Sequence, residues 1–318
     1  MSGYLHDGQW HSGWYDTDRH QGRFERRASG FRHWIGAADG VFPAAPDRYH
    51  LYVSYACPWA HRTLILRALK GLESIVPVSV VQPVMGEHGW TFGEAGDPLQ
   101  GVRHLHEIYT RAQPDYSGRV TVPVLWDRQS ERIVNNESAD ILRMLNTAFD
   151  AWARPAPDFY PAPLRPAIDR INAQVYEHVN NGVYRAGFAT AQAAYEQAYE
   201  ALFDMLDQLE ARLAGAAFLC GEQVTEADWR LFTTLVRFDA VYHGHFKCNR
   251  QRLVEFPQLW DYARALYQTP GVAATVRMDH IKQHYYASHT HINPTGIVPA
   301  GPATDWLAPT RRQVAPLN

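Results

Sequence analysis

Hydrophobic and polar residues alternate along the stretch YHLYVSY, residues 49–55. A period of two residues is the period of a β-strand. Farther along, Leu64, Ala68 and Leu72 recur at the spacing of one helical face. Pro58 suits the first turn of that helix, because its missing amide hydrogen would have no partner there in any case. The pattern therefore predicts a strand, a turn and a helix in direct succession.

Short apolar runs continue through the first half of the chain. The run at residues 75–81 contains Pro77, so its strand is expected to start late or to lie at a sheet edge. The segments VTVPVLWD and RIVNN predict two short strands joined by a turn at residues 127–131. Asn135 or Asn136 is then expected to cap the helix ESADILRMLN. This order, strand, helix, strand and then strand, strand, helix, is that of a thioredoxin-like domain.

The second half of the chain has a helical period. It follows a proline-rich stretch, residues 151–166, which interrupts both helix and strand and is typical of a linker. The segment ALFDMLDQLEARLAG carries one apolar stripe, and Thr225 with Asp228 predicts a capping box at the start of the next helix. Two further helices are expected at residues 257–268 and 272–285. The fold class is therefore an α/β thioredoxin-like N-terminal domain followed by an all-α C-terminal domain.

These patterns divide the chain into five parts. The first part shows no clear period and is expected to be an irregular arm that wraps a neighbouring part of the protein. The expected parts are an N-terminal arm, 1–48; a thioredoxin-like domain, 49–150; a proline-rich linker, 151–166; an all-helical domain, 167–288; and an extended C-terminal tail, 289–318.

Composition and charge exclude several classes of function. The formal net charge of −3 leaves no broad basic field, so nucleic acid is not an expected partner. Charged or polar residues interrupt every apolar run before the roughly 18 residues that a membrane span needs. The three cysteines are widely spaced, and the N-terminal sequence MSGYLHDGQW lacks the features of a secretion signal, so a cytoplasmic location is expected.

Cys57 stands between the first predicted strand and helix, in YACPWAHR. A cysteine just before a helix faces unsatisfied backbone amides and the positive end of the helix dipole, which favour its nucleophilic thiolate. Most lone cysteines are buried structural residues, but this context favours the reactive interpretation. Dithiol oxidoreductases carry a second cysteine at the position of Ala60, so an external thiol, glutathione, must regenerate Cys57. Cys220 and Cys248 stand at no motif spacing and are expected to be packing residues.

Residues that could bind glutathione follow in the same half of the chain. Val122 precedes Pro123, and a cis bond there would expose the valine amide and carbonyl to the cysteinyl amide of glutathione. Ser138, at a helix start, suits the γ-glutamyl carboxylate, and Glu137 suits the ammonium group. Simple capping explains Glu137 and Ser138 equally well when they are considered alone.

Several segments together resemble the glutathionyl-hydroquinone reductases, the Xi class of glutathione transferases. They are RYHLYVSYACPWAHRTLILRALKGLE, GWTF, VTVPVLWD, NNESADI, NNGVYRAGFA, LFTTLVRFDAVYHGHFKCN and HYYASHTHINPTGIVPAGP. The resemblance implies the glutathione transferase fold, a homodimer, and reduction of S-glutathionyl-hydroquinones to hydroquinones with a second glutathione as thiol donor. In this family Cys57 matches the nucleophile. The glutathione-binding positions match Trp90, Arg119, Val122, Glu137 and Ser138, and the tyrosines around the hydroquinone match Tyr184, Tyr242 and Tyr285.

Other interpretations remain open at this point. An omega-like thiol transferase or a dehydroascorbate reductase would share the fold and the cysteine. A non-catalytic protein of the same fold, binding aromatic ligands or serving as an interaction module, would share only the fold. Histidines cluster in HYYASHTHI and HLHE, but neither cluster has the cysteine or carboxylate spacing of a metal site, so no metal is expected.

Overall fold

The computed structural model describes residues 3–26 and 28–314, and within them the chain forms two compact units. The first unit comprises residues 3–14, 28–156 and 275–298, and the second comprises residues 15–26, 157–274 and 299–314. Residues 275–298, although far along the chain, thus cluster with the N-terminal half. The domain boundaries expected from the sequence remain a prediction.

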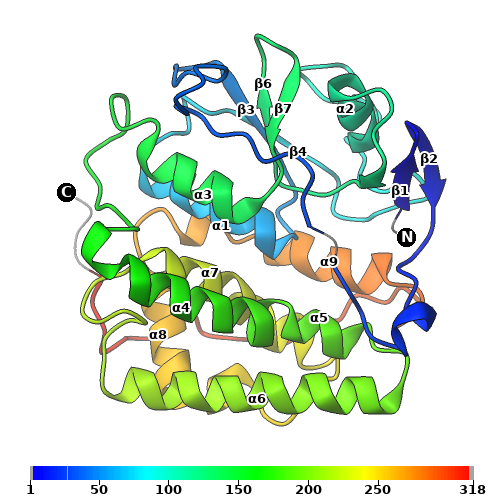
Figure 1. Ribbon diagram of the computed structural model, residues 1–318. Coiled ribbons are helices and arrows are strands. Elements are labelled where there is room, and N and C mark those ends of the chain that lie inside the picture. The colour runs from blue at the N-terminus through cyan, green and yellow to red at the C-terminus, as the bar shows by residue number, and fades with distance from the viewer. Residues whose placement is uncertain (1–2, 27, 315–318) are drawn as a thin grey trace. The chain divides into compact units, whose positions relative to one another are not determined.

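A four-stranded sheet forms the centre of the first unit (Figure 1). The strand order is β4-β3-β6-β7, with bounds Tyr49–Val53 for β3, Val78–Val80 for β4, Val124–Asp127 for β6 and Arg132–Asn135 for β7. β3 runs parallel to β4 and antiparallel to β6, and β6 and β7 are antiparallel neighbours. All five residues of β3, which lies between β4 and β6, are buried. β4 starts after Pro77 and lies at the sheet edge, as the proline predicts.

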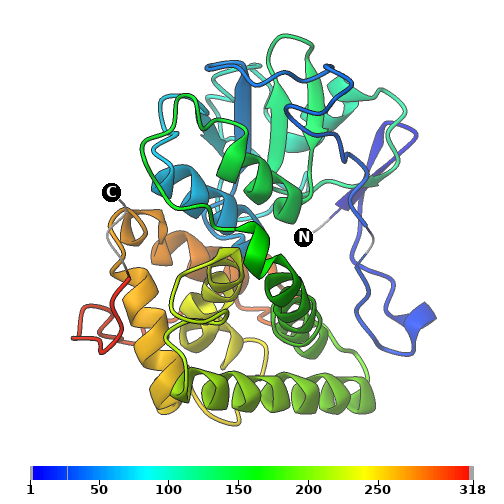
Figure 2. The ribbon, with the colours of Figure 1, turned by 60° about the vertical axis from the view of Figure 1, so that its left-hand side comes forward.

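Helices connect and cover these strands. Those of the first unit are α1, Pro58–Leu69; α2, Leu105–Ala112; α3, Ser138–Thr147; and α9, Met278–Ser288. α1 packs against α3, and the two lie side by side in Figures 1 and 2. α9 begins six residues later than the sequence pattern predicts, after a short 3-10 turn at Ala273–Thr275. The Val122–Pro123 peptide bond is cis, which is the condition set for Val122 above.

The N-terminal arm is more ordered than expected. It contains β1, Gly3–His6, and β2, Gln9–Ser12, which pair antiparallel, and β1 also pairs with the short strand β5, Gly118–Arg119. Asp7 and Gly8 form the connecting turn, both with positive φ, as a two-residue hairpin loop requires. The expectation of an irregular segment was wrong here because four-residue strands are too short to show a period.

The start of α3 also differs from the prediction. The N-cap is Glu137, whose carboxylate accepts a hydrogen bond from the Ala139 amide at 3.2 Å. Asn135 remains the last residue of β7, and its side-chain oxygen accepts from the Glu137 amide at 2.7 Å. The strand β7 therefore extends through Asn135, and the cap of α3 is Glu137 instead of an asparagine.

The second unit is helical (Figure 2). Its α-helices are α4, Arg165–Val175; α5, Gly182–Gly187; α6, Gln192–Ala214; α7, Glu226–Arg237; and α8, Pro257–Tyr267. α6 packs against α5 and α8, and α7 packs against α4 and α8. The predicted capping box at the start of α7 is present, with the Asp228 carboxylate accepting from the Thr225 amide at 2.7 Å. α4 and α7 each continue into a π-helix, at Tyr176–Asn180 and Phe238–Tyr242.

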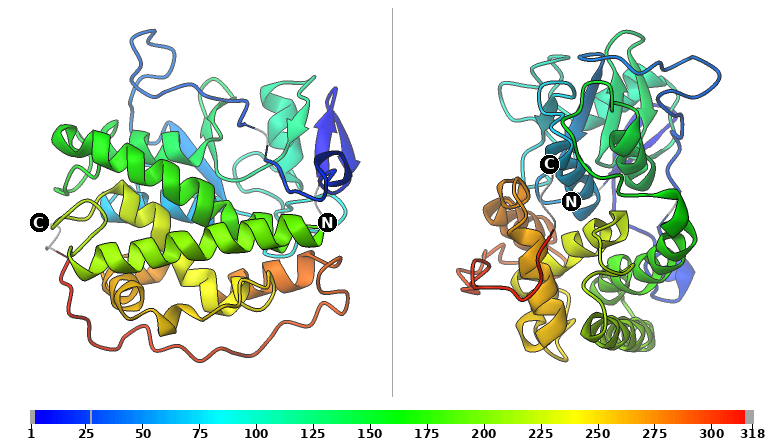
Figure 3. Two further views of the ribbon diagram at one scale, coloured as in Figure 1. Left: turned by 60° about the horizontal axis from the view of Figure 1, so that its bottom comes forward. Right: turned by 90° about the vertical axis from the view of Figure 1, so that its left-hand side faces the viewer.

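Residues 299–314 form an extended segment of the second unit (Figure 3). Asp261 of α8 accepts hydrogen bonds from the Arg311 amide at 3.0 Å and from the Arg312 guanidinium at 2.6 Å. The Gln268 amide donates to the Trp306 carbonyl at 2.8 Å. These contacts hold the segment along its own unit. Across the described residues, no helix has the combination of length and apolar character needed to cross a membrane.

A buried polar chain runs beneath β3 in the first unit. The His50 ring lies 2.8 Å from the Ser79 hydroxyl, and Ser79 donates to the Asp97 carboxylate. The Tyr52 hydroxyl donates to the other oxygen of Asp97 at 3.2 Å. Burial lowers the pKa of His50 to about 4, so the ring is neutral at physiological pH.

This histidine predicts an acid sensitivity of folding. The pKa of His50 is lower in the folded chain than its unfolded value of about 6.5, so the unfolded state binds more protons between pH 6.5 and pH 4. The free energy of unfolding should therefore fall across that window, by roughly 3 kcal/mol in total. Urea unfolding at several pH values, for wild type and His50→Gln, measures the effect. The variant should lose stability less steeply, and equal slopes in the two proteins would rule out His50 as the cause.

Candidate functional site

Cys57 lies at the junction between β3 and α1. Its backbone is extended, with φ −78° and ψ 121°, and it is the N-cap residue of α1. The Cys57 carbonyl accepts the first helical hydrogen bond, from the His61 amide at 2.9 Å, and Pro58 is the first helical residue. The sulfur therefore lies where the first-turn amides and the helix dipole favour negative charge. This is the position that the sequence pattern predicts for a reactive thiolate.

The structure brings Val122 next to this cysteine. The Cys57 sulfur lies 3.6 Å from the Val122 carbonyl oxygen, in a contact between residues 65 apart in the sequence. Val122 immediately precedes the cis bond and the start of β6. A main-chain edge that can pair with an extended peptide thus adjoins the sulfur atom.

Glu137 and Ser138 lie at the start of α3, in the same unit as Cys57. Besides capping the helix, the Glu137 carboxylate accepts a hydrogen bond from the Ser29 hydroxyl at 3.0 Å. The Ser138 side chain is buried. The capping role considered from the sequence is therefore present for Glu137. A carboxylate has further acceptor positions, so this role leaves room for an ammonium group.

Arg119 holds the N-terminal hairpin. Its guanidinium donates to the carbonyls of Gly13 at 2.8 Å, Trp14 at 2.9 Å and Gly3 at 3.3 Å, and it lies over the Tyr4 ring. These contacts give Arg119 a structural function that the sequence did not indicate. Its contact with glutathione remains a prediction.

Trp90 contacts α9, the helix that also carries Tyr285. The Trp90 ring is buried and stacks on His284 at 4.8 Å between ring centroids, and His284 directly precedes Tyr285. Two contacts tie the segment around α9 to the Cys57 end of α1: His61 lies 2.8 Å from the Thr275 hydroxyl, and the Tyr55 and His280 rings pack edge to face. The segment that leads into α9 and the first turn of α9 thus contact the Cys57 end of α1.

Tyr184 and Tyr242 form a separate aromatic cluster in the second unit. Their ring centroids are 6.1 Å apart, and Phe246 lies 5.5 Å from each. Both tyrosines are buried, and Tyr242 ends the π-helix that follows α7, a type of distortion often found at functional sites. Gly187 is required for this packing, because a Cβ atom there would lie 2.1 Å from the Phe246 ring.

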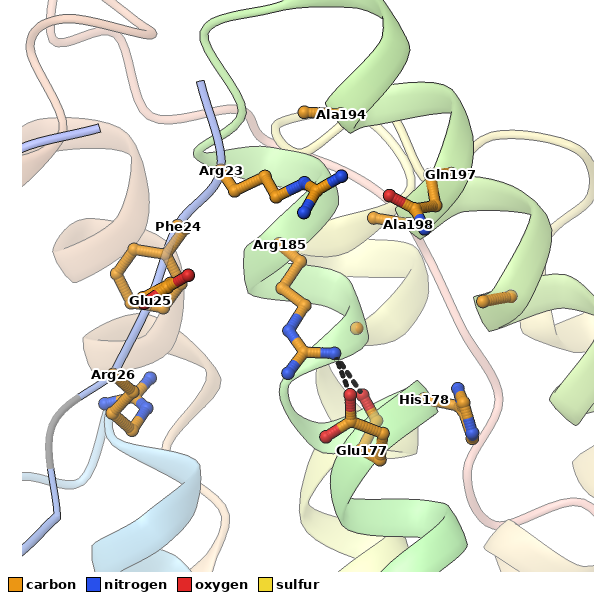
Figure 4. A pocket seen from close by; sticks show the side chains of 12 residues that line it. Arg23, Phe24, Glu25, Arg26, Glu177, His178, Arg185, Ala194, Gln197 and Ala198 are labelled. Atoms are coloured by element: carbon orange, nitrogen blue, oxygen red, sulfur yellow. Dashed lines mark hydrogen bonds and ion pairs between the residues drawn. The ribbon is translucent and has the colours of Figure 1, made fainter. Parts of the chain in front are cut away.

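A pocket of about 480 Å³ adjoins this cluster (Figure 4). Its walls come from residues 23–26 and from the helices that carry Glu177 and Arg185, which form an ion pair. Arg26 also lies over the Tyr184 ring, at 5.3 Å, so the pocket and the cluster share a wall. The sequence did not indicate this pocket because nothing in residues 23–26 reveals that they fold onto α5.

The other two cysteines have the surroundings of packing residues. Cys248 is fully buried, and burial raises the pKa of its thiol well above the ordinary value. Cys220 is half-buried, and burial raises its thiol pKa as well. Both thiols are therefore poor nucleophiles near neutral pH.

Two family models match the chain. The model of the glutathione S-transferase N-terminal domain matches residues 56–148, and the model of the C-terminal domain matches residues 192–265. These matches confirm the expected fold class, an α/β thioredoxin-like N-terminal domain with an all-α C-terminal domain. Together, the fold and the two family models define a protein of the glutathione transferase superfamily.

Relatives cover nearly the whole chain. The glutathionyl-hydroquinone reductase PcpF of Sphingobium chlorophenolicum is 55% identical over 305 residues, which are 95% of this chain and 96% of PcpF. The glutathionyl-hydroquinone reductase YqjG of Escherichia coli is 53% identical over 98% of this chain and 99% of its own. The solved Xi class transferase from Natrialba magadii superposes with a TM-score of 0.91, at 49% identity, over 98% of this chain and 96% of that chain. The chain belongs to the glutathionyl-hydroquinone reductase family, the Xi class of glutathione transferases.

Proposed function

We propose that this protein reduces S-glutathionyl-hydroquinones to free hydroquinones, with glutathione as co-substrate and Cys57 as nucleophile. The observation that carries the proposal is the place of Cys57, at the N-cap of α1 and 3.6 Å from the carbonyl beside the cis bond. The names of the relatives PcpF and YqjG, both glutathionyl-hydroquinone reductases, support the substrate class. The glutathione-bound structure of YqjG, which is 50% identical with a TM-score of 0.89, supports the co-substrate.

The reaction follows from the chemistry of one thiolate. The Cys57 thiolate attacks the sulfur of the glutathionyl group, a sulfur–sulfur bond forms, and the bond between sulfur and the aromatic carbon breaks. The electron pair of the broken bond stays on the ring carbon, which takes up a proton. A second glutathione, as its thiolate, then attacks the mixed disulfide on Cys57 and leaves as glutathione disulfide. Overall, one glutathionyl-hydroquinone and one glutathione give one hydroquinone and one glutathione disulfide.

Residues of the first unit are proposed to hold glutathione. Val122 pairs with the cysteinyl amide, which places the sulfur of the ligand near Cys57. Ser138 and the first amides of α3 bind the γ-glutamyl carboxylate, and Glu137 binds the ammonium group. Trp90 and Arg119 complete the predicted set.

The tyrosines are proposed to assist the step in which the bond between sulfur and the aromatic carbon breaks. An aromatic carbon is a poor leaving group unless its charge is delocalised or protonated as the bond breaks. Phenol donors near the hydroquinone oxygens favour a keto-like form of the ring and deliver the proton. We assign this function to Tyr184, Tyr242 and Tyr285.

Turnover of glutathionyl-menadiol with excess glutathione tests the proposed reaction. Free menadiol and glutathione disulfide should appear in equal amounts, as chromatography of the products measures. Dehydroascorbate and a small glutathione mixed disulfide serve as comparison substrates. Much faster reduction of either one would favour the omega-like alternative, and no turnover of any of the three would favour a non-catalytic binding protein.

Replacement of Tyr184 by phenylalanine should slow the reduction of a glutathionyl-hydroquinone but not the reduction of a small mixed disulfide. The variant keeps the ring that packs on Phe246 but loses the hydroxyl, so kcat on glutathionyl-menadiol should fall by roughly 10²-fold. Reduction of a small mixed disulfide should be largely unchanged, because its leaving group is a thiolate that needs no ring protonation. Tyr195→Phe on α6, whose hydroxyl donates to the Lys247 carbonyl, is the matched control. Equal losses on both substrates would mean that Tyr184 acts only in packing.

We further propose a cytoplasmic homodimer. The spacing of the cysteines and the need for abundant reduced glutathione support the location. The resemblance to the family supports the dimer. Light scattering after size-exclusion chromatography, with a mass twice that of the chain, would agree with it.

A further inference from the structure

Three histidines outside the proposed active site converge in the first unit. His88 lies in the turn closed by the pairing of Gly86 with Gly89, His104 directly precedes α2, and His106 lies in the first turn of α2. One side-chain nitrogen from each lies within 4.8 Å of the other two. Throughout residues 3–26 and 28–314, no other group of three potential ligands is as close.

Two of these side chains contain nitrogens that are shielded from solvent. His106 Nε2 makes no hydrogen bond in the described part of the chain, and the His104 side chain faces the Glu107 amide in a capping box at the start of α2. A buried polar atom without a partner destabilises the folded chain. The nearby Glu107 carboxylate accepts hydrogen bonds from the Arg103 and His104 backbone amides, at 3.2 and 2.9 Å, and none from the His106 Nε2 atom.

We infer that His88, His104 and His106 form a binding site for a late first-row divalent metal ion, with Zn²⁺ as the preferred occupant. Imidazole nitrogen is a ligand that suits Zn²⁺, Ni²⁺ and Cu²⁺ and that Mg²⁺ or Ca²⁺ seldom uses. Three histidines would leave one coordination position for water or another small ligand. The sequence showed only His104 and His106 in HLHE, and the third ligand comes from a loop that the fold brings to them.

The geometry requires a modest movement of the side chains. In a tetrahedral site with Zn–N distances of about 2.0–2.1 Å, ligand nitrogens lie roughly 3.3 Å apart, which is closer than the 4.8 Å limit that this group satisfies. His88 is exposed and can make most of that movement.

Ring stacking is the competing explanation for the cluster. The Trp10, His106, His104 and His88 rings contact one another in succession, with centroids 4.8, 5.1 and 4.6 Å apart, and His88 also lies 6.3 Å from His106. The His104 and His106 planes differ by 14°, and parallel rings do not direct their in-plane lone pairs to one point. A bound metal must therefore turn the His104 or the His106 ring away from this parallel arrangement, whereas pure stacking predicts no binding.

A metal bound at this site would also restrain the loop that carries Trp90. The Leu105 amide donates to the Trp90 carbonyl at 2.9 Å, and Thr91 pairs with His104. Residues 90 and 91 are already held to the start of α2 by these contacts. A metal that joins His88 to His104 and His106 would hold the preceding part of the loop there as well. Amide hydrogen exchange of residues 86–91 should therefore slow when Zn²⁺ binds.

Calorimetric titration with Zn²⁺ tests the inference, in a Cys57→Ser background because thiolates also bind zinc. The parent should bind one equivalent, and both His88→Ala and His104→Gln should weaken binding by at least about tenfold. His6→Ala, which replaces an exposed histidine elsewhere in the first unit, should leave binding unchanged.

Because His88 is exposed, its variant should unfold at the same urea concentration as the parent. Equal affinity in the parent and His88→Ala, or no binding up to about 1 mM zinc, where fixed metal sites would be saturated, would overturn the site and leave ring stacking as the explanation.

Discussion

Replacement of Cys57 by serine should reduce turnover of glutathionyl-hydroquinones by at least about 10³-fold. The serine hydroxyl is not ionised near neutral pH, so the field at the start of α1 that favours a thiolate cannot produce a nucleophile there. The variant also cannot form the mixed disulfide through which the second glutathione acts. Steady-state release of menadiol from glutathionyl-menadiol measures the loss.

Two comparisons distinguish a chemical loss from a structural one. Glutathione binding, measured by calorimetry, should survive in Cys57→Ser, because the proposed contacts of Val122, Glu137 and Ser138 do not involve the sulfur. Cys220→Ser should keep normal turnover, since burial raises the pKa of that thiol and removes it from the chemistry. Full activity of Cys57→Ser would show that Cys57 is a structural residue.

Replacement of Asp228 by alanine should lower the free energy of unfolding by about 4 kcal/mol. The carboxylate is fully buried at the start of α7 and accepts from the Leu219 amide at 2.9 Å, from the Thr225 amide at 2.7 Å and hydroxyl at 3.0 Å, and from the Tyr262 hydroxyl at 2.9 Å. Burial raises the pKa of Asp228, and these four donors oppose that effect. Alanine would leave all four donors without an acceptor in the core of the second unit.

Urea unfolding followed by circular dichroism measures this loss. Asp204→Ala, an exposed position on α6 of the same unit, is the matched control and should change stability by less than about 0.5 kcal/mol. Tyr262→Phe removes one of the four donors and should fall between the two. A loss no larger than that of the control would mean that the capping box contributes little to the second unit.

Local pattern predicted most of the sheet and of the long helices. The alternation at residues 49–55 predicted β3, and the segments VTVPVLWD and RIVNN predicted β6 and β7. Thr225 and Asp228 form the predicted capping box of α7. These predictions succeeded because each depends on residues close together in the sequence. The cysteine at the start of α1 belongs to the same group, since proline and helix period alone place it there.

The predictions that failed concern features that depend on contacts between residues far apart in the sequence. The hairpin of β1 and β2 is stabilised by β5, which lies more than a hundred residues away in the sequence. Glu137 replaced the predicted asparagine caps because β7 continues through Asn135. The π-helix that ends at Tyr242 has no signal in the apolar period.

The candidate site was predicted unevenly for the same reason. Cys57 and Val122 followed from local chemistry, and the structure places them in contact next to the cis bond between Val122 and Pro123. Their roles in the reaction remain predictions. The three tyrosines came from the family resemblance, and no local feature distinguishes them from packing residues. His88 was missed as a partner of His104 because only the fold joins its loop to α2.

A single-turnover experiment tests the mechanism most directly. Wild-type protein mixed with glutathionyl-menadiol, without free glutathione, should release up to one menadiol per chain and gain one glutathionyl group. Mass spectrometry of the intact protein and of its peptides should place that group on Cys57, and added glutathione should remove it as the disulfide. Release of menadiol with no adduct on the protein, or an adduct on Cys220 instead, would contradict the mechanism.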